Sequence, residues 1–304
     1  MITRYTYRDL LWLDVESPTQ DEVRSLMQEF GINTTVAEEI LLPSLKPKVD
    51  FYKDYIYLIL HFPAIRHTYT GNPNQEVDFI IGKKFIITTR YDTIDPMHKF
   101  SKIFEVNSIL DRSDMGDHAG YIFFYMIKKL YKSLIHELEY IETSLQNTEN
   151  KIFEGKEVEV VKELSEISRL LLAFQKGTST HQDVLESFEI AGKIFFGEDF
   201  NYNLKAMLSE YYKVNHMIEN EKRFLDELRE TNNSLLSTKQ NEIMKALTII
   251  AFTALPITVI SGIFNMSTKY TPIIGRENDF WIIVGGAFFI TFAVMWYFKR
   301  KKWL

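Results

Sequence analysis

The stretch Ala246–Thr268, ALTIIAFTALPITVISGIFNMST, decides the class of this protein. It holds 23 residues without a charged side chain, and a second stretch, Phe280–Phe298, holds 19. A helix rises about 1.5 Å per residue, so roughly 20 apolar residues cross the hydrocarbon core of a bilayer, which is about 30 Å thick. The sequence therefore predicts two transmembrane helices, at 246–267 and 280–298, joined by a short external loop at 268–279.

The end of the second stretch predicts the orientation of the chain. Trp296 and Tyr297 form an aromatic belt, and the four cations Lys299–Lys302 follow directly. Aromatic side chains gather at the membrane surface, and basic flanks mark the cytoplasmic side. The basic tail at 299–304 is therefore expected in the cytoplasm. Two crossings place the N-terminal body there as well, in a plasma or inner membrane protein.

Short β-rich and helical runs alternate in residues 1–115, which predicts a cytoplasmic α/β domain. The turn pairs Lys53-Asp54 and Gly82-Lys83 each separate two apolar runs, which is the pattern of a β-hairpin. The predicted elements are a strand at 11–15, a helix that starts within 17–23 and ends near Phe30, hairpins at 49–62 and 77–89, and a helix at 96–109.

From residue 116 onward, apolar side chains recur three and four positions apart, which is typical of amphipathic helices. With breaks at Gly155 and at Phe196–Asp199, the spacing predicts helices at 117–153 and 157–195 and a third that begins at 200. The region 116–199 is thus expected to hold long antiparallel helices. The region 200–245 is expected to be a stalk that continues into the first membrane helix, and its apolar face predicts self-association.

Acidic side chains outnumber basic ones in the helical region. Residues 121–242 carry 21 acids and 15 bases, a deficit that equals the net charge of −6 of the whole chain. One interpretation is a solvated helical surface with staggered ion pairs. The other is that acidic faces in an oligomer bind divalent cations that hold them together. This charge balance does not support nucleic-acid binding.

The usual sequence signs of an enzyme are missing. The chain has no Cys, which removes disulfides, thiolate metal sites and cysteine catalysis. The seven His residues show no metal-ligand spacing, and there is no phosphate-binding Gly loop or nucleophile elbow. The sequence therefore favours a protein that is not an enzyme and has no organic cofactor.

One face of the first membrane helix carries small, hydroxyl or weakly polar side chains. At 100° per residue this face consists of Asn241, Met244, Thr248, Ala251, Leu255, Thr258 and Gly262. Small residues let helices approach closely, so the face is compatible with an ordinary helix interface. It is equally compatible with the wall of a pore. Pro256 predicts a kink in this helix.

Four segments resemble the corresponding parts of the CorA magnesium and cobalt channel family. They are NEIMKALTIIA at 241–251, LPIT at 255–258, SGIF at 261–264 and YFKRKKWL at 297–304. The order of α/β domain, long helices, stalk and two crossings is similar to that family as well. The resemblance implies a homopentameric funnel in the lipid bilayer, with five first membrane helices around a central pore. Such a pore conducts Mg²⁺, and also Co²⁺ or Ni²⁺, inward.

The resemblance also implies roles for single residues. The implied pore-lining residues are Asn241, Met244, Leu247, Thr248, Ala251, Leu255, Thr258 and Gly262. Asn241 would form a polar ring at the cytoplasmic mouth, and the larger apolar side chains would form constrictions. The family is regulated by acidic pairs between neighbouring subunits. Glu210 is the carboxylate closest to the matching stalk position, so it is the candidate for a regulatory Mg²⁺.

The family signature Gly-Met-Asn is replaced here by Asn265-Met266-Ser267, the candidate selectivity filter. Mg²⁺ gives up its water reluctantly, so a filter can hold the hydrated ion through neutral oxygens. The Asn265 amide and the Ser267 hydroxyl both offer such oxygens. In the external loop, Glu277 and Asp279 either attract cations or are simply solvated.

Two classes of function remain open from the sequence. A divalent-cation channel for Mg²⁺ is favoured, and a Zn²⁺ transporter of the same superfamily is a variant of it with a different ion. The altered signature motivates the rival class, a non-conducting pentameric membrane protein that serves as a scaffold or sensor.

Overall fold

The computed structural model describes residues 1–44, 46–63, 74–91, 94–110, 116–265, 273 and 278–301. The chain forms two compact units, Met1–Leu228 and Arg229–Leu304. The predicted α/β region and the predicted antiparallel helices pack together in the first unit. The second unit contains both predicted membrane segments.

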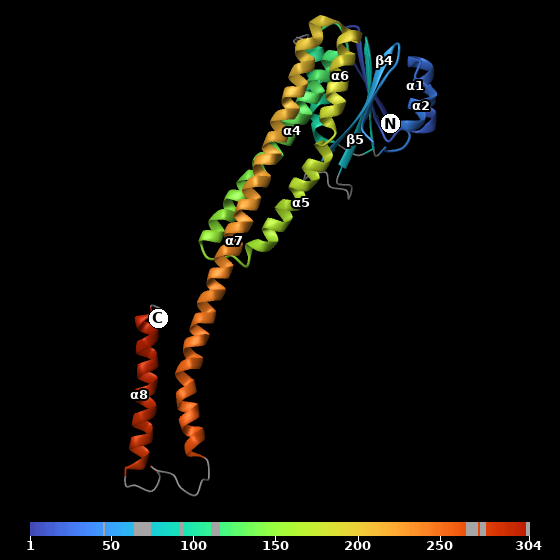
Figure 1. Cartoon of the computed structure of the whole chain (residues 1–304). Helices are drawn as coiled ribbons and strands as arrows, with labels where there is room; N and C mark the ends of the chain where they lie inside the picture. The colour runs from blue at the N-terminus through green and yellow to red at the C-terminus, as the bar shows by residue number, and fades with distance from the viewer. Residues whose placement is uncertain are drawn as a thin grey trace. The chain divides into compact units, whose positions relative to one another are not determined.

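A six-stranded sheet forms the centre of the first unit (Figure 1). The strands are β1 (Ile2–Tyr7), β2 (Leu10–Glu16), β3 (Lys48–Phe51), β4 (Tyr55–Pro63), β5 (Asn74–Gly82) and β6 (Phe85–Arg90). Their order is β1-β2-β6-β5-β4-β3, with β2 and β6 parallel and the other neighbours antiparallel. Both predicted hairpins are confirmed, because β3 pairs with β4 and β5 pairs with β6.

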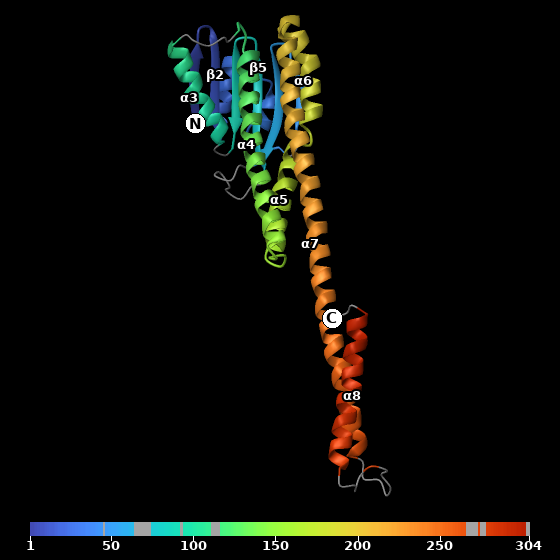
Figure 2. The same cartoon turned by 90° about the vertical axis from the view of Figure 1, so that its left-hand side faces the viewer.

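Helices cover both faces of this sheet. The helices α1 (Gln20–Phe30) and α2 (Thr34–Glu39) lie on one face, and α3 (Asp95–Leu110) and α4 (Gly120–Phe153) lie on the other (Figures 1 and 2). The predicted start of α1 is confirmed at Thr19. The Thr19 hydroxyl accepts the Glu22 N–H, and the Glu22 carboxylate accepts the Thr19 N–H, which is a capping box.

The helix predicted at 157–195 is two helices, which corrects the sequence interpretation. These are α5 (Val160–Thr178) and α6 (His181–Phe196), separated at Ser179 and Thr180. The Ser179 hydroxyl donates to the carbonyl of Lys176 at 3.1 Å, a bond that competes with helix continuation. Fully buried His181 then fixes the start of α6, since its Nε2 lies 2.7 Å from the carbonyl oxygen of His61 on β4.

The helix α7 (Asn201–Phe264) is a single element of 64 residues, as the absence of Gly and Pro over 201–246 predicts. It continues through Pro256. Within the first unit its buried positions are alternately three and four residues apart, the repeat of helices packed side by side. These positions are Leu204, Met207, Tyr211, Val214, Ile218, Glu221, Leu225 and Leu228.

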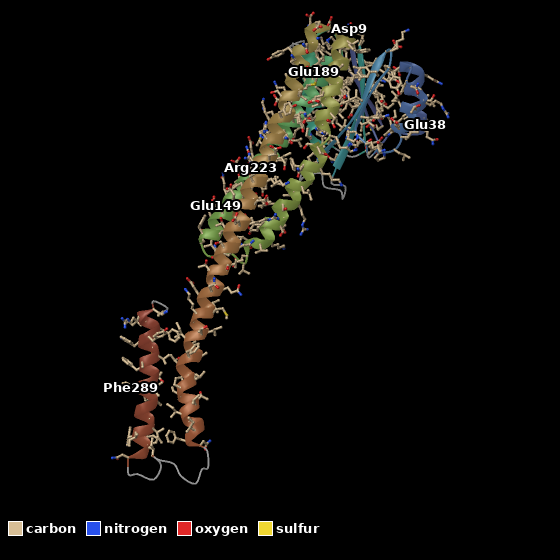
Figure 3. All side chains as sticks on the ribbon, viewed as in Figure 1. Asp9, Glu38, Glu149, Glu189, Arg223 and Phe289 are labelled. Carbon is tan, nitrogen blue, oxygen red and sulfur yellow. The ribbon has the colours of Figure 1, made fainter. Side chains whose placement is uncertain are left out.

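In the second unit, the end of α7 and the helix α8 (Asp279–Arg300) run side by side in opposite directions (Figures 1 and 2). Both helices are long and apolar enough to cross a membrane. The segment 280–298 lies within one apolar helix, and residues 246–264 form the end of α7, so the two predicted crossings fall on candidate membrane helices and stay predictions. Figure 3 shows nitrogen and oxygen atoms densely over the first unit and sparsely along α8.

Candidate functional site

The predicted pore face lies on α7 within the second unit. The exposed members of that set are Asn241, Met244, Leu247, Ala251, Leu255, Thr258 and Gly262. The half-buried positions of the same segment are Thr248, Ile249, Thr253, Pro256, Ile260 and Phe264. At 100° per residue, the exposed set and the half-buried positions other than Thr248 lie on roughly opposite sides of the helix. The exposed members of the predicted pore face therefore lie away from the half-buried side of α7.

Thr248 is the exception among the predicted pore-lining residues. Together with Phe252 it borders an apolar groove of about 580 Å³ between α7 and α8. The Phe252 and Phe298 rings meet at one side of this groove, with centroids 5.8 Å apart. Thr248 thus lies where the predicted pore face meets the α8 side, whereas its neighbours on that face do not border the groove.

The threonine hydroxyls of this face are bonded within their own helix. Thr248 Oγ1 donates to the carbonyl of Met244 at 2.7 Å, and Thr258 Oγ1 donates to that of Ala254 at 3.0 Å. A hydroxyl has one proton and two lone pairs. Because the proton is used inside the helix, each of these oxygens presents only acceptor sites to its surroundings. Acceptors of this kind suit the water molecules of a hydrated cation.

The end of α7 carries the predicted filter. Asn265 follows the last helical residue, its N–H donates to the carbonyl of Ser261 at 3.1 Å, and it is exposed. Met266, Ser267 and Glu277 lie outside the described residues. Asp279 begins α8, and its side chain lies outside the described part of the chain. Of the predicted filter, Asn265 is therefore the residue that the structure describes.

The predicted regulatory residue Glu210 is partly buried and already has a cationic partner. Its side chain is 17% exposed, and its Oε1 lies 3.1 Å from the Nζ of Lys213 on the next turn of α7. A cation that already neutralises the carboxylate weakens its attraction for Mg²⁺. Among the described residues, no three His, Asp or Glu side chains are grouped as metal ligands.

The sequence interpretation missed an acid inside the helical layer of the first unit. Glu221 was counted with the solvated acids of 121–242, but it is 7% exposed and occupies a core position of α7. The sequence could have predicted this burial, because the alternating three- and four-residue spacing of apolar residues along α7 passes through position 221.

Comparison with known proteins agrees with the fold and with the two apolar helices. The family model described as "CorA-like Mg2+ transporter protein" matches residues 7–300. The sequence is similar to the cobalt/magnesium transport protein CorA of Thermotoga maritima, with 26% identity over 288 residues that cover 93% of this chain and 80% of that protein.

Two solved structures share the fold. The CorA magnesium transporter from Methanocaldococcus jannaschii is similar with a TM-score of 0.83 at 20% identity, covering 99% of this chain and 94% of that one. The ZntB cytoplasmic domain from Vibrio parahaemolyticus is similar with a TM-score of 0.61 at 13% identity, covering 76% of this chain and 88% of that one. The family match spans the sheet, the helical layer, the predicted pore face of α7 and α8, so the chain belongs to the family of CorA-like Mg²⁺ transporter proteins.

Proposed function

We propose that this protein is a channel through which Mg²⁺, and also Co²⁺ or Ni²⁺, enters the cell. The observation that carries the proposal is the uncovered face of α7. Met244, Leu247 and Leu255 are each 55% exposed in the single chain, although they lie in or beside a membrane segment. Since the half-buried positions other than Thr248 lie on the other side of α7, this face is free to meet copies of itself around a shared axis.

In the proposed homopentamer, five α7 helices surround the axis and α8 lies outside them. Rings of Met244, Leu247 and Leu255 then narrow the pathway, and such apolar constrictions gate by excluding water. The segment from Ala246 to Thr268 has no charged side chain, so the wall offers the ion only neutral oxygens. Mg²⁺ is reluctant to lose its water, so a neutral wall that accepts hydrogen bonds from that water suits it.

The outer mouth is assigned to Asn265-Met266-Ser267, with Glu277 and Asp279 as acids that concentrate cations nearby. Both chain ends are placed in the cytoplasm of a plasma or inner membrane protein. A regulatory Mg²⁺ bound at Glu210 would displace Lys213 from its carboxylate.

The zinc variant has one specific observation in its favour, the structural similarity to the ZntB cytoplasmic domain. The chemistry of the predicted pathway favours Mg²⁺ instead. Zn²⁺ prefers nitrogen and sulfur ligands from His and Cys. The chain contains no Cys, and no His lies between Asn241 and Thr268. A regulatory or scaffold protein without conduction is the remaining alternative.

Ion uptake into liposomes that contain the purified full chain tests the proposal. Each of Mg²⁺, Co²⁺, Ni²⁺ and Zn²⁺ is added outside, and uptake is followed with a trapped fluorescent indicator. We expect Mg²⁺ uptake that depends on the protein and increases with an inward gradient. Uptake of Zn²⁺ alone would favour a Zn²⁺ transporter. Uptake of none of the four ions would favour a non-conducting scaffold or sensor.

A further inference from the structure

Glu221 is an acid at a position of α7 that otherwise holds apolar side chains. The core positions before and after it are Val214, Ile218, Leu225 and Leu228. Only 7% of Glu221 is exposed, and its Oε2 atom has no hydrogen-bond partner. A buried carboxylate without a partner is costly when it is ionised, because it loses its hydration.

The charged group that acts on Glu221 is another acid, Glu142 on α4. Burial and, second, repulsion by Glu142 raise the pKa of Glu221 to about 7. A second carboxylate therefore increases the cost of ionising the first.

The nearby cations have other partners or are exposed. On α7, Lys222 Nζ donates to the side chain of Gln175 on α5 at 3.4 Å, and Arg223, labelled in Figure 3, donates to Asn220 at 2.5 Å. On α5, Arg169 and Lys176 are exposed.

The neighbouring acids Glu139 and Glu219 are bonded to other side chains. Glu139 on α4 accepts a bond from His136 at 3.0 Å, and Glu219 on α7 accepts one from Asn215 at 3.3 Å. Within the described part of the chain, Glu221 is thus buried beside an acid and has no basic partner.

Among the described residues, no third acid or histidine joins Glu221 and Glu142 to form a larger metal-ligand group. A proton needs one oxygen only. We propose that Glu221, buried at a core position of α7 with an unpartnered carboxylate oxygen, is a proton-binding switch, in which the bound proton lets α7 pack against α4 and its release forces the two helices apart.

The placement of this switch connects it to the second unit. Helix α7 continues without a break from Glu221 to the predicted pore face. If the proposed function holds, a movement of α7 at Glu221 changes the conducting helix itself. This consequence rests on the proposed function, whereas the proton switch does not.

The absence of Cys in the sequence allows a direct distance measurement. Spin labels are attached to Gln146→Cys on α4 and Glu227→Cys on α7, two exposed positions near Glu142 and Glu221. The full chain is reconstituted in lipid nanodiscs with an excess of unlabelled chain, and pulsed electron resonance gives the label separation from pH 5.5 to pH 8.5. We expect the separation to increase with a midpoint near pH 7.

Three variants make the test specific. In Glu221→Gln, the separation stays at its low-pH value throughout, because the amide cannot ionise. In Glu142→Gln, the midpoint falls by about one pH unit, because the repelling charge is gone. The exposed control Glu219→Gln follows the wild type. A constant separation in the wild type, or a pH response retained in Glu221→Gln, overturns the proposal.

Transport gives an independent reading in the same variants. The initial rates of Mg²⁺ uptake at pH 6 and pH 8 differ in the wild type and agree in Glu221→Gln. If the labels move but no ion is taken up, the proposed function fails and the proton switch stands. If ions are taken up but the labels do not move, the proton switch fails and the proposed function stands.

Discussion

At the scale of single residues, the Thr258 hydroxyl shows how a neutral side chain can serve a cation. Its proton is used by the carbonyl of Ala254, so its lone pairs are left for water. We expect Thr258→Val to lower Mg²⁺ uptake about tenfold, which corresponds to the loss of a hydrogen bond of about 1.4 kcal/mol. The measurement is uptake into liposomes at equal protein content.

A matched control for Thr258 lies on α8. Thr291 Oγ1 donates to the carbonyl of Ala287 at 2.8 Å, so its local bonding is the same. Thr291→Val should leave uptake unchanged, since α8 lies outside the proposed pathway. An equal loss in both variants would mean that the effect of Thr258→Val comes from the helix and not from the pathway.

His181 makes a second prediction at this scale. A backbone carbonyl only accepts, so Nε2 carries the ring proton and donates to His61, and Nδ1 accepts from the Tyr131 hydroxyl at 2.7 Å. Burial lowers the pKa of His181 to about 4 from an ordinary value of 6.5. The unfolded chain therefore binds more protons than the folded chain between these values.

As a result, His181 reduces the stability of the folded chain as the pH falls from about 6.5 to about 4, by up to about 3 kcal/mol. We expect the thermal unfolding midpoint of the full chain to fall over that interval. In His181→Gln the fall should be smaller, although the variant is less stable at pH 7. The same acid dependence in both proteins would show that His181 is already charged when folded.

At the scale of elements, sequence patterns predicted most of the first unit. The hairpins β3–β4 and β5–β6 were predictable because apolar runs are separated by short polar turns at Lys53-Asp54 and Gly82-Lys83. The strand β1 was not predicted, because its Thr, Arg and Tyr residues give no apolar run. Its partner strand and the stacking of Tyr5 on Trp12, at 4.6 Å between centroids, hold it in the sheet.

The break between α5 and α6 was missed for a different reason. The sequence interpretation followed the apolar spacing on either side of Gly177–Thr180 and did not weigh these four residues, which carry no large apolar side chain and favour a break. The break depends on the bonds that His181 makes to β4 and α4, which are distant in sequence. Contacts of this kind cannot be read from periodicity.

The candidate site was predictable only in part. The spacing placed seven residues on one face of α7 but left an interface and a pore equally open. The structure adds that, of these seven residues, only Thr248 borders the groove between α7 and α8. Met266, Ser267 and Glu277 lie outside the described residues, so their assigned roles stay predictions.

The contact between α7 and α8 yields a prediction of its own. Phe298 is 8% exposed and packs against Phe252, whereas Phe289 on the same helix, labelled in Figure 3, is 76% exposed. Packing, and not water exclusion, holds helices together in lipid. Phe298→Ala should lose about 1 kcal/mol and lower the unfolding midpoint in detergent by about 2–4 °C.

The control for this contact is Phe289→Ala, which should leave the midpoint within about 1 °C of the wild type because that ring has few contacts to lose. If the two variants melt alike, the α7–α8 packing described here does not contribute to stability.

At the scale of the whole molecule, the central claim is that one face of α7 lines an ion pathway shared by several copies of the chain. The family, the two apolar helices and the uncovered face all support it, and the chain's lack of Cys allows it to be tested site by site. Leu255 and Ile260 suit this purpose, because they lie five residues apart, about 140° around α7, and belong to the exposed and half-buried sets.

The most direct measurement is the block of Mg²⁺ uptake by a small, water-soluble, thiol-reactive cation in Leu255→Cys and Ile260→Cys. We expect the reagent to abolish uptake in Leu255→Cys and to leave uptake in Ile260→Cys unchanged. Block in Ile260→Cys with none in Leu255→Cys would place the pathway on the α8 side of α7 and contradict the central claim.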